Sequence, residues 1–279
     1  MTTPLIDPIR WPLEAIWEAV VPGLPGFTAE VVPSIDSSNT ELMRRFRGSP
    51  YGSEGSPNAE PRSEPVLLVA EQQTAGRGRL GRDWHSTDAD SPNMSLTFSL
   101  ALPLAPADWS GLSLAVGVSV AQSLHPSLQL KWPNDVWLDG RKLGGILIET
   151  AGFGEHRVAV VGIGLNIAAP APEVAAGLAV APAWLQEVLP GVDAGAALLR
   201  IAAPLVQAMK AFELAGFAPF QPQFAQRDLL LDRAVTLSNG TVGMARGVDG
   251  HGGLRVQTPE GWQTVTSAEV SVRAVKEAG

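Results

Sequence analysis

Three glycines and three arginines alternate in one short segment, the first place in the sequence whose residue types could do chemistry. The segment EQQTAGRGRLGRDW runs from Glu71 to Trp84 and directly follows an apolar run that is typical of a strand. Glycine permits positive φ angles that turn successive backbone amides toward one anion, and guanidinium groups bind phosphate in a bidentate manner. The Gly-Lys-Ser/Thr ending of a Walker loop is missing. We therefore expect an anion-binding loop, and the alternative is a solvated basic turn.

A second segment, KWPNDVW, places Lys131 at the end of an apolar run. Pro133 fixes the turn that presents Asn134 and Asp135, and the sequence RKLGGILIE follows at residues 141–149. An ammonium group held close to a sheet can neutralise a developing oxyanion or a phosphate. On residue types alone, however, a lysine in a strand and turn is more often a surface charge than a catalyst.

A third segment, VGIGLNI, carries Gly162, Gly164 and Asn166 on a predicted strand. It has no third glycine opening a helix, so it is not a dinucleotide-binding fingerprint. The two glycines are better explained as positions that leave room for a ligand against the sheet, with Asn166 as a polar contact.

Composition limits the classes of protein that these segments could serve. The chain has 279 residues, with 20 Lys+Arg and 28 Asp+Glu, and its net charge of −8 argues against a protein that holds nucleic acid by overall charge. The absence of cysteine excludes disulfides, thiolate metal sites and thiol nucleophiles, and it fits a cytoplasmic location. The acidic N-terminus does not resemble a signal peptide, and the uncharged stretch 109–130 is too polar for a membrane span. We interpret that stretch as a buried helix.

The elements that must position these segments follow from periodicity and turn signals. Ser38 and Glu41 have the spacing of a capping box at the start of a helix, and residues 48–65 are expected to form a mobile surface loop. Alternation of apolar and polar residues over 93–102 predicts a half-buried strand. Further strands are expected at 65–70, 128–132, 136–138, 142–149 and 158–167, with an Asp139-Gly140 hairpin turn and a helix over 110–124. This order predicts an α+β fold with helices packed on a mixed or antiparallel sheet.

The last part of the chain changes character. Residues 168–216 are rich in alanine and predict helices, with Leu198, Ile201, Leu205, Met209 and Phe212 at helical spacing. From about Leu229, short strands with glycine turns predict a small all-β barrel whose charges cancel, which makes it a poor nucleic-acid module. We therefore expect one domain over 1–228 and a second over 229–279.

Taken together, the motifs resemble those of the biotin protein ligases. The family pattern is a Ser/Thr-Asn start, a GRGRxGR loop ending near Trp, a KWPND segment, K-x-x-G-I-L-x-E and G-x-G-x-N. Here these match Ser37 to Asn39, Gly76 to Trp84, Lys131 to Asp135, Lys142 to Glu149 and Gly162 to Asn166, in that order. The resemblance covers the chain from about residue 33 to its end. It implies a fold like that of class II aminoacyl-tRNA synthetases, with an SH3-like β-barrel at the C-terminus.

The resemblance also implies roles for individual residues. Lys131, Arg77 and Arg79 would be catalytic, and Asp135 would lie on the Mg²⁺ side of a bound MgATP. The biotin site would comprise Ser37, Ser38, Asn39, Gln73, Gly76, Arg77, Gly78, Arg79, Lys131, Gly144, Gly145, Gly162 and Gly164. The ATP and adenylate site would comprise Arg79, Arg82, Trp84, Asn134, Asp135, Lys142, Asn166 and Arg273.

The implied partners are biotin, ATP and a biotin carboxyl carrier protein, with no membrane and no DNA, and the protein would be a monomer or a weak homodimer. Leu80 stands where the family loop often has another arginine. Only about thirty-five residues precede the Ser-Asn start, too few for the winged helix-turn-helix of the DNA-binding members, so we expect no repressor activity. Two alternatives remain: a lipoate or octanoyl ligase or transferase of similar fold, and a regulator that binds biotin or nucleotide without making a product.

Overall fold

A computed structural model describes residues 9–47, 64–84, 94–153, 156–169, 182–238, 240–266 and 272–274. Its main feature is a seven-stranded sheet with the order β1-β2-β3-β7-β6-β5-β4. The strands are β1 Thr28–Ile35, β2 Val66–Gln73, β3 Ser95–Pro103, β4 Gln129–Lys131, β5 Asp135–Leu138, β6 Arg141–Phe153 and β7 His156–Asn166. β1 and β2 are parallel and every other pair is antiparallel, so the sheet is mixed.

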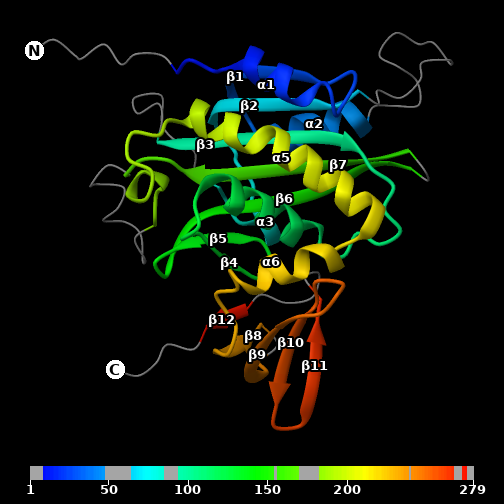
Figure 1. Ribbon diagram of the computed structural model, residues 1–279, viewed down its shortest axis with the longest axis vertical. Helices are drawn as coiled ribbons and strands as arrows, with labels where there is room; N and C mark the ends of the chain where they lie inside the picture. Colours follow the sequence, from blue (N-terminus) through cyan, green and yellow to red (C-terminus); the bar gives the residue numbers. More distant parts are fainter. Residues whose placement is uncertain are drawn as a thin grey trace, which may run out of the picture.

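Helices cover both faces of this sheet. α1 (Leu13–Val20), α3 (Leu112–Leu124) and α5 (Ala194–Ala215) form one layer, which carries the larger hydrophobic core. α2 (Ser38–Arg47) packs on the opposite face, where Leu42, Met43 and Phe46 meet a smaller apolar cluster on β2, β3, β6 and β7. α5 crosses the sheet in yellow in Figure 1. The other short helical segments in the described residues are η1 (Arg79–Gly81), η2 (Leu185–Glu187), η3 (Ala218–Phe220) and α6 (Gln221–Ala225).

The C-terminal part forms a second sheet of five antiparallel strands, drawn in orange and red at the bottom of Figure 1. Its strands are β8 Ala234–Leu237, β9 Val242–Val248, β10 Leu254–Thr258, β11 Gly261–Val265 and β12 Val272–Ala274. The predicted α+β class, with a small all-β part after a helical region, is confirmed. At the predicted hairpin, Asp139 and Gly140 both have positive φ, 47° and 72°, as a type I′ turn requires.

The predicted helical periodicity of α5 is confirmed, because the residues expected on its apolar face are all fully buried. These residues are Leu198, Ile201, Leu205, Met209 and Phe212. By length and composition alone α5 could cross a bilayer, but half of its apolar window is buried inside the protein. We therefore interpret α5 as a core helix, and its buried face packs on α3 and β3.

Two expectations about local structure were wrong. β3 is not half-buried: Thr97 and Ser99 on its polar side are 5% and 0% exposed, because the strand lies in the middle of the sheet with layers on both faces. The cap of α2 is Ser37, whose hydroxyl accepts from the Thr40 amide at 3.4 Å, and Glu41 pairs with arginines of its own helix instead. Most of the expected mobile loop, residues 48–63, lies outside the described residues.

Candidate active site

The floor of the site is one row of residues that runs across five strands of the sheet. Thr97 on β3 is paired with Gly164 on β7, Gly164 with Gly145 on β6, Gly145 with Asp135 on β5, and Asp135 with Lys131 on β4. Directly paired residues project to the same face. At about 4.8 Å between strands, the row spans about 19 Å. Neither glycine has a side chain in the middle of this row; the Trp84 ring lies over Gly164, and the space over Gly145 borders Lys142 and Asp135.

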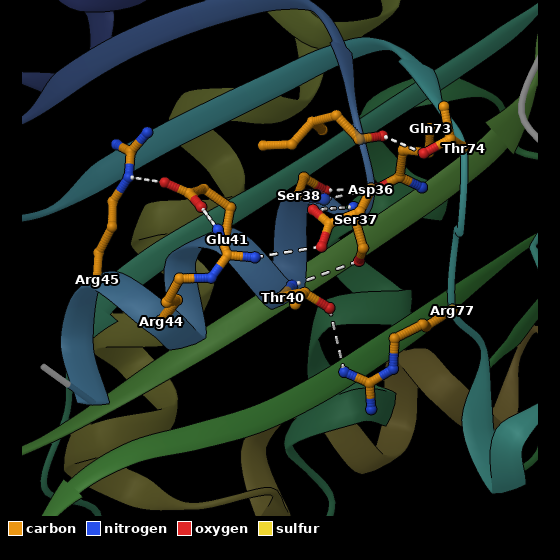
Figure 2. A network of polar contacts seen from close by, with 11 residues as sticks. Asp36, Ser37, Ser38, Thr40, Glu41, Arg44, Arg45, Gln73, Thr74 and Arg77 are labelled. Atoms are coloured by element: carbon orange, nitrogen blue, oxygen red, sulfur yellow. Dashed lines mark hydrogen bonds and ion pairs between the residues drawn. The ribbon is translucent and has the colours of Figure 1, made fainter.

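One end of the cleft is lined by neutral hydrogen-bonding groups at the start of α2. The Gln73 side-chain oxygen accepts from the backbone amide of Ser38 at 2.7 Å and from its hydroxyl at 3.0 Å. The Ser99 hydroxyl lies 2.7 Å from that of Ser38 and donates to Asn39 Oδ1 at 2.6 Å. Ser38, Asn39 and Ser99 are all buried. Figure 2 shows Ser38 facing Gln73 across the gap between the helix and β2. These groups hold one another in fixed orientations.

Glu149 on β6 connects this end to the glycine-arginine loop. Its carboxylate accepts from Asn39 Nδ2 at 3.1 Å and pairs with Arg77 at 3.2 Å. Arg77 also reaches the Thr40 hydroxyl at 3.4 Å, a contact visible in Figure 2. One carboxylate thereby fixes both the amide of Asn39 and the guanidinium of Arg77.

The loop itself folds as a tight hairpin over the cleft. The Trp84 amide donates to the Gly76 carbonyl at 2.9 Å, and the Gly78 amide donates to the Arg82 carbonyl at 2.6 Å. Of the three glycines only Gly81 has positive φ, so the expected anion nest built from all three was wrong. Gly76 is required for close approach instead, because a Cβ there would lie 2.3 Å from the Trp84 carbonyl oxygen.

Leu80, the residue that departs from the family pattern, has φ 57° and ψ 35° within η1 and is 69% exposed. Its side chain borders the mouth of the cleft. A left-handed conformation is unusual for a residue with a branched side chain. The turn of the loop is therefore formed by Leu80 and Gly81 together.

The other end of the cleft is cationic. Lys142 pairs with Asp135 at 2.7 Å, and the ammonium of Lys131 lies 4.8 Å from the centre of the Trp137 ring. Arg79 donates to Asn134 Oδ1 at 3.5 Å. Burial lowers the pKa of the Arg79 guanidinium, with the Asp135 charge opposing and Arg82 reinforcing that shift. Arginine stays protonated at physiological pH regardless, so this end attracts an anion.

Most of the predicted site residues line this one cleft. Those that do are Ser37, Ser38, Asn39, Gln73, Arg77, Gly78, Arg79, Arg82, Trp84, Lys131, Asn134, Asp135, Lys142, Gly145, Gly162 and Gly164. Gly76, Gly144 and Asn166 do not; Asn166 donates instead to the Ala183 carbonyl at 3.0 Å. Arg273 lies in β12 opposite Thr236, and its side chain is outside the described part of the chain.

The glycines of β7 make room for protein side chains. A Cβ on Gly162 would lie 2.3 Å from Asn39 Oδ1, and a Cβ on Gly164 would lie 2.4 Å from the Trp84 ring. Sequence reasoning expected these positions to clear space for a ligand. In the structure, Asn39 and Trp84 occupy that space.

Three polar residues of the cleft region were missed from the sequence as site residues: Thr97, Ser99 and Glu149. The alternation along β3 did identify Thr97 and Ser99 as its polar side, but that side was expected to face solvent. Glu149 ends a motif that was recognised, although no role was given to it.

The turn after β9, in the second sheet, contacts the segment that carries Lys131. Trp132, which follows Lys131 and is 1% exposed, donates its indole N–H to the Gly252 carbonyl at 3.0 Å. The peptide between Trp132 and Pro133 is cis. Gly252 lies so close to the start of α3 that a Cβ there would be 2.7 Å from Gly111 Cα. The two sheets are therefore in direct contact next to Lys131.

Comparison with known proteins agrees with this architecture. The family described as "Biotin/lipoate A/B protein ligase family" matches residues 42–166, and "Biotin protein ligase C terminal domain" matches residues 233–273. The chain is 32% identical over 263 residues to the bifunctional ligase/repressor BirA of Escherichia coli, covering 91% of this chain and 76% of that protein. It is 33% identical over 248 residues to the biotin–[acetyl-CoA-carboxylase] ligase of Paracoccus denitrificans, covering 84% of this chain and 96% of that one.

A solved structure gives the same result. The biotin protein ligase of Aquifex aeolicus, in complex with biotin and ATP, has 28% sequence identity and a TM-score of 0.69, covering 89% of this chain and 99% of that chain. Fold and sequence together define the class of biotin and lipoate protein ligases. Within that class, the chain belongs to the biotin protein ligase family, whose members are ligases that form a C–N bond.

Proposed function

We propose that this protein is an ATP-dependent biotin protein ligase that makes biotinyl-5′-AMP and then transfers biotin to one lysine of a biotin carboxyl carrier protein. The observation that carries the proposal is the row from Thr97 to Lys131, which offers a long cleft with neutral donors and acceptors at one end and cations at the other. Such a cleft suits a neutral ring system joined to an anion. We also propose a boundary near residue 228, a cytoplasmic location, a monomer or weak homodimer, and no repressor function.

The chemical problem is to join a carboxylate to an amine, which do not react without activation. In the proposed reaction the biotin carboxylate attacks the α-phosphate of ATP, and pyrophosphate leaves. The carrier lysine amine then attacks the mixed anhydride, and AMP leaves. Neither step needs a protein nucleophile, so the work of the protein is positioning and charge neutralisation. We propose that Lys131, Arg79 and Lys142, which all line the cleft, neutralise the carboxylate and phosphate charges.

Mg²⁺ would arrive with ATP as part of the substrate. Among the residues that the structure describes, no three His, Cys, Asp or Glu side chains cluster as a metal site. Mg²⁺ bound to nucleotide phosphates commonly uses only one or two protein carboxylates, which Asp135 in the cleft can provide. Asp135 is paired with Lys142 in the structure. When MgATP binds, Asp135 would turn to Mg²⁺ and Lys142 to the phosphates, so this ion pair would separate.

The two alternatives make different predictions. A lipoate or octanoyl ligase would bind a linear acyl chain rather than biotin, and octanoyl transfer normally uses a cysteine, of which this chain has none. A regulator would bind biotin and release no pyrophosphate. Isothermal titration with biotin, followed by an assay of ATP-dependent pyrophosphate release, separates the three. Failure of biotin to bind, or binding without pyrophosphate release, would contradict the proposal.

Lys131→Ala tests the catalytic centre. We expect single-turnover formation of the adenylate to slow by about 100-fold or more, because an electrostatic contact to the reacting groups is lost. Folding, followed by circular dichroism and thermal unfolding, should be preserved, because Lys131 is only partly buried. An unchanged rate of adenylate formation would show that Lys131 is a surface charge, the simpler interpretation of its sequence context.

A further inference from the structure

The ammonium of Lys131 lies over the face of an aromatic ring, 4.8 Å from the centre of the Trp137 side chain. Trp137 follows Asp135 by two positions on β5, and Asp135 is the residue paired with Lys131 across β4 and β5. Side chains two positions apart on a strand share a face, and a long side chain can reach the diagonal neighbour on the next strand. Lys131 therefore meets Asp135 directly across and Trp137 diagonally.

A β-bulge places Lys142 beside the same tryptophan. The register between β5 and β6 shifts between Val136 and Trp137, so Trp137 is paired with Lys142 and not with Leu143. Leu143 is fully buried in the core, while Lys142 reaches Asp135 at 2.7 Å. Bulges often re-aim a side chain next to an active site. Trp137 thus lies between the two strands that carry the lysines of the cationic end.

The indole of Trp137 is a costly side chain for a position that needs only packing. Its Nε1 is buried, and no hydrogen-bond partner reaches it from the part of the chain that the structure describes. A leucine or a phenylalanine could pack there without leaving a buried donor unpaired. What tryptophan adds is the face of its ring, which attracts a cation more strongly than the face of phenylalanine or tyrosine. The contact with Lys131 is therefore a reason for tryptophan at this position.

We propose that Trp137 is a positioning residue that holds the ammonium of Lys131 at the cationic end of the cleft. Trp137 itself is not among the described residues that line the cleft. A free lysine samples many rotamers, and this freedom is lost when the ammonium binds an anion. Holding the ammonium in place beforehand lowers that cost. The inference rests on the proposed ligase activity and on the role proposed there for Lys131, and it adds a residue that acts through Lys131.

Trp137→Leu and Trp137→Phe test the inference as a pair, because leucine removes the aromatic face and phenylalanine keeps a weaker one. In single-turnover assays, Trp137→Leu should slow adenylate formation by about tenfold, and Trp137→Phe should retain most of the rate. If leucine prevents folding, Trp137→Met repeats the test with a side chain that fills irregular space. In the Lys131→Ala background, loss of the ring should cause no further slowing, because its effect acts through Lys131.

A second measurement does not depend on activity. The chain has only four lysines, so a protein labelled with ¹³C-lysine gives few side-chain signals in NMR spectra. The signal that disappears in Lys131→Ala belongs to Lys131. Because an aromatic ring shields protons over its face, the ε protons of Lys131 should resonate upfield of those of a free lysine. This shift should be lost in Trp137→Leu and kept in Trp137→Phe.

Trp262→Leu is the matched control. The centre of the Trp262 ring lies 4.6 Å from the guanidinium carbon of Arg255, and neither residue is among the described ones that line the cleft. This variant should form the adenylate at the unmodified rate. An unchanged rate in Trp137→Leu, an equal loss in Trp137→Phe, a further loss in the Lys131→Ala background, or a Lys131 signal that Trp137→Leu does not move would each overturn the inference. Failure of the proposed function differs from these results, because the unmodified protein would then form no adenylate while the Lys131 shift could still be measured.

Discussion

Glu149 connects two residues at the uncharged end of the cleft, where we propose that biotin binds. It is the common partner of Asn39 and Arg77, so one carboxylate ties a helix start to a loop through β6. Glu149→Gln keeps the shape and removes the charge. We expect the dissociation constant for biotin to rise by about tenfold or more, because hydrogen bonds to a charged group contribute about 1.5–3 kcal/mol each. Isothermal titration measures the effect directly.

The control for Glu149→Gln is Glu30→Gln. Glu30 also accepts from an arginine, Arg45, at 2.9 Å, but Arg45 does not line the cleft, whereas Asn39 and Arg77, the partners of Glu149, both do. We expect this variant to bind biotin normally. Equal biotin affinity in the two variants, with equal losses of thermal stability, would mean that Glu149 serves the fold and not the site.

The sequence identified which residues belong to the site better than it identified which residues contact one another. Gln73, Ser38 and Lys131 were expected in it and line the cleft. Glu149 received no role because an ion pair across 72 positions of sequence leaves no local pattern. Asn166 was expected to contact a ligand, but its amide is used by Ala183, a partner that only the tertiary fold brings near.

At the scale of elements, β7 contributes to the site through a glycine, Gly162, whose missing side chain leaves room for Asn39. Gly162 admits the Asn39 amide, which Ser99 holds from β3. In Gly162→Ala the new Cβ would meet Asn39 Oδ1 at 2.3 Å, so the amide must leave its position and break its bond to Ser99. We expect biotin affinity to fall by about tenfold, with a loss of stability of about 1–3 kcal/mol from overpacking.

A double-mutant cycle tests whether the effect of Gly162→Ala runs through Asn39. If it does, Asn39→Ala combined with Gly162→Ala should bind biotin no worse than Asn39→Ala alone. Additive losses would contradict the mechanism. Gly250→Ala is the control for an added methyl group, because a Cβ there meets nothing within 4 Å.

Periodicity predicted the buried side chains correctly where only one face of an element is apolar. It failed where other parts of the protein pack on both faces of the element. α5 has a continuous apolar stripe, so its helical spacing alone identified the buried side chains. β3 alternates, and alternation on its own does not distinguish a polar face in water from one that lines a cleft under α2 and the loop. The difference depends on the order of strands in the sheet, which is set by long-range pairing.

At the scale of the whole molecule, the two sheets are joined next to Lys131. The chain between them, Arg227 to Leu229, adds to the edge of β4: the Leu130 amide donates to the Arg227 carbonyl at 2.8 Å, and the Leu229 amide donates to the Leu130 carbonyl at 2.9 Å. Trp132 reaches the Gly252 carbonyl on the other side of Lys131. The position of Lys131 therefore depends on both sheets.

Asp228 lies in the middle of this junction. One of its carboxylate oxygens accepts from the Leu230 amide at 2.9 Å, and the other has no hydrogen-bond partner among the residues that the structure describes. Burial raises the pKa of Asp228 to about 6, with backbone hydrogen bonds from Leu230 and Leu231 opposing the shift. The native state therefore holds the proton more tightly than the unfolded chain, whose carboxyl has the ordinary pKa of 3.8. The unfolding free energy should fall as pH rises from about 4 to about 6 and then level off.

Asp228→Asn removes the cost of the buried charge and keeps an oxygen for the Leu230 amide. At pH 8 we expect the variant to be more stable than the unmodified protein by about 1–3 kcal/mol, and at pH 4.5 the difference should shrink to about a third of that, because Asp228 is then protonated in the native state but still mostly ionised in the unfolded chain. Urea unfolding at the two pH values measures this. Asp232→Asn, at an exposed carboxylate paired with Arg246, should change stability by less than about 0.5 kcal/mol at either pH. Only a titrating carboxylate makes the stability difference between asparagine and aspartate depend on pH. An equal gain in unfolding free energy at both pH values would therefore mean that the buried charge of Asp228 does not destabilise the junction.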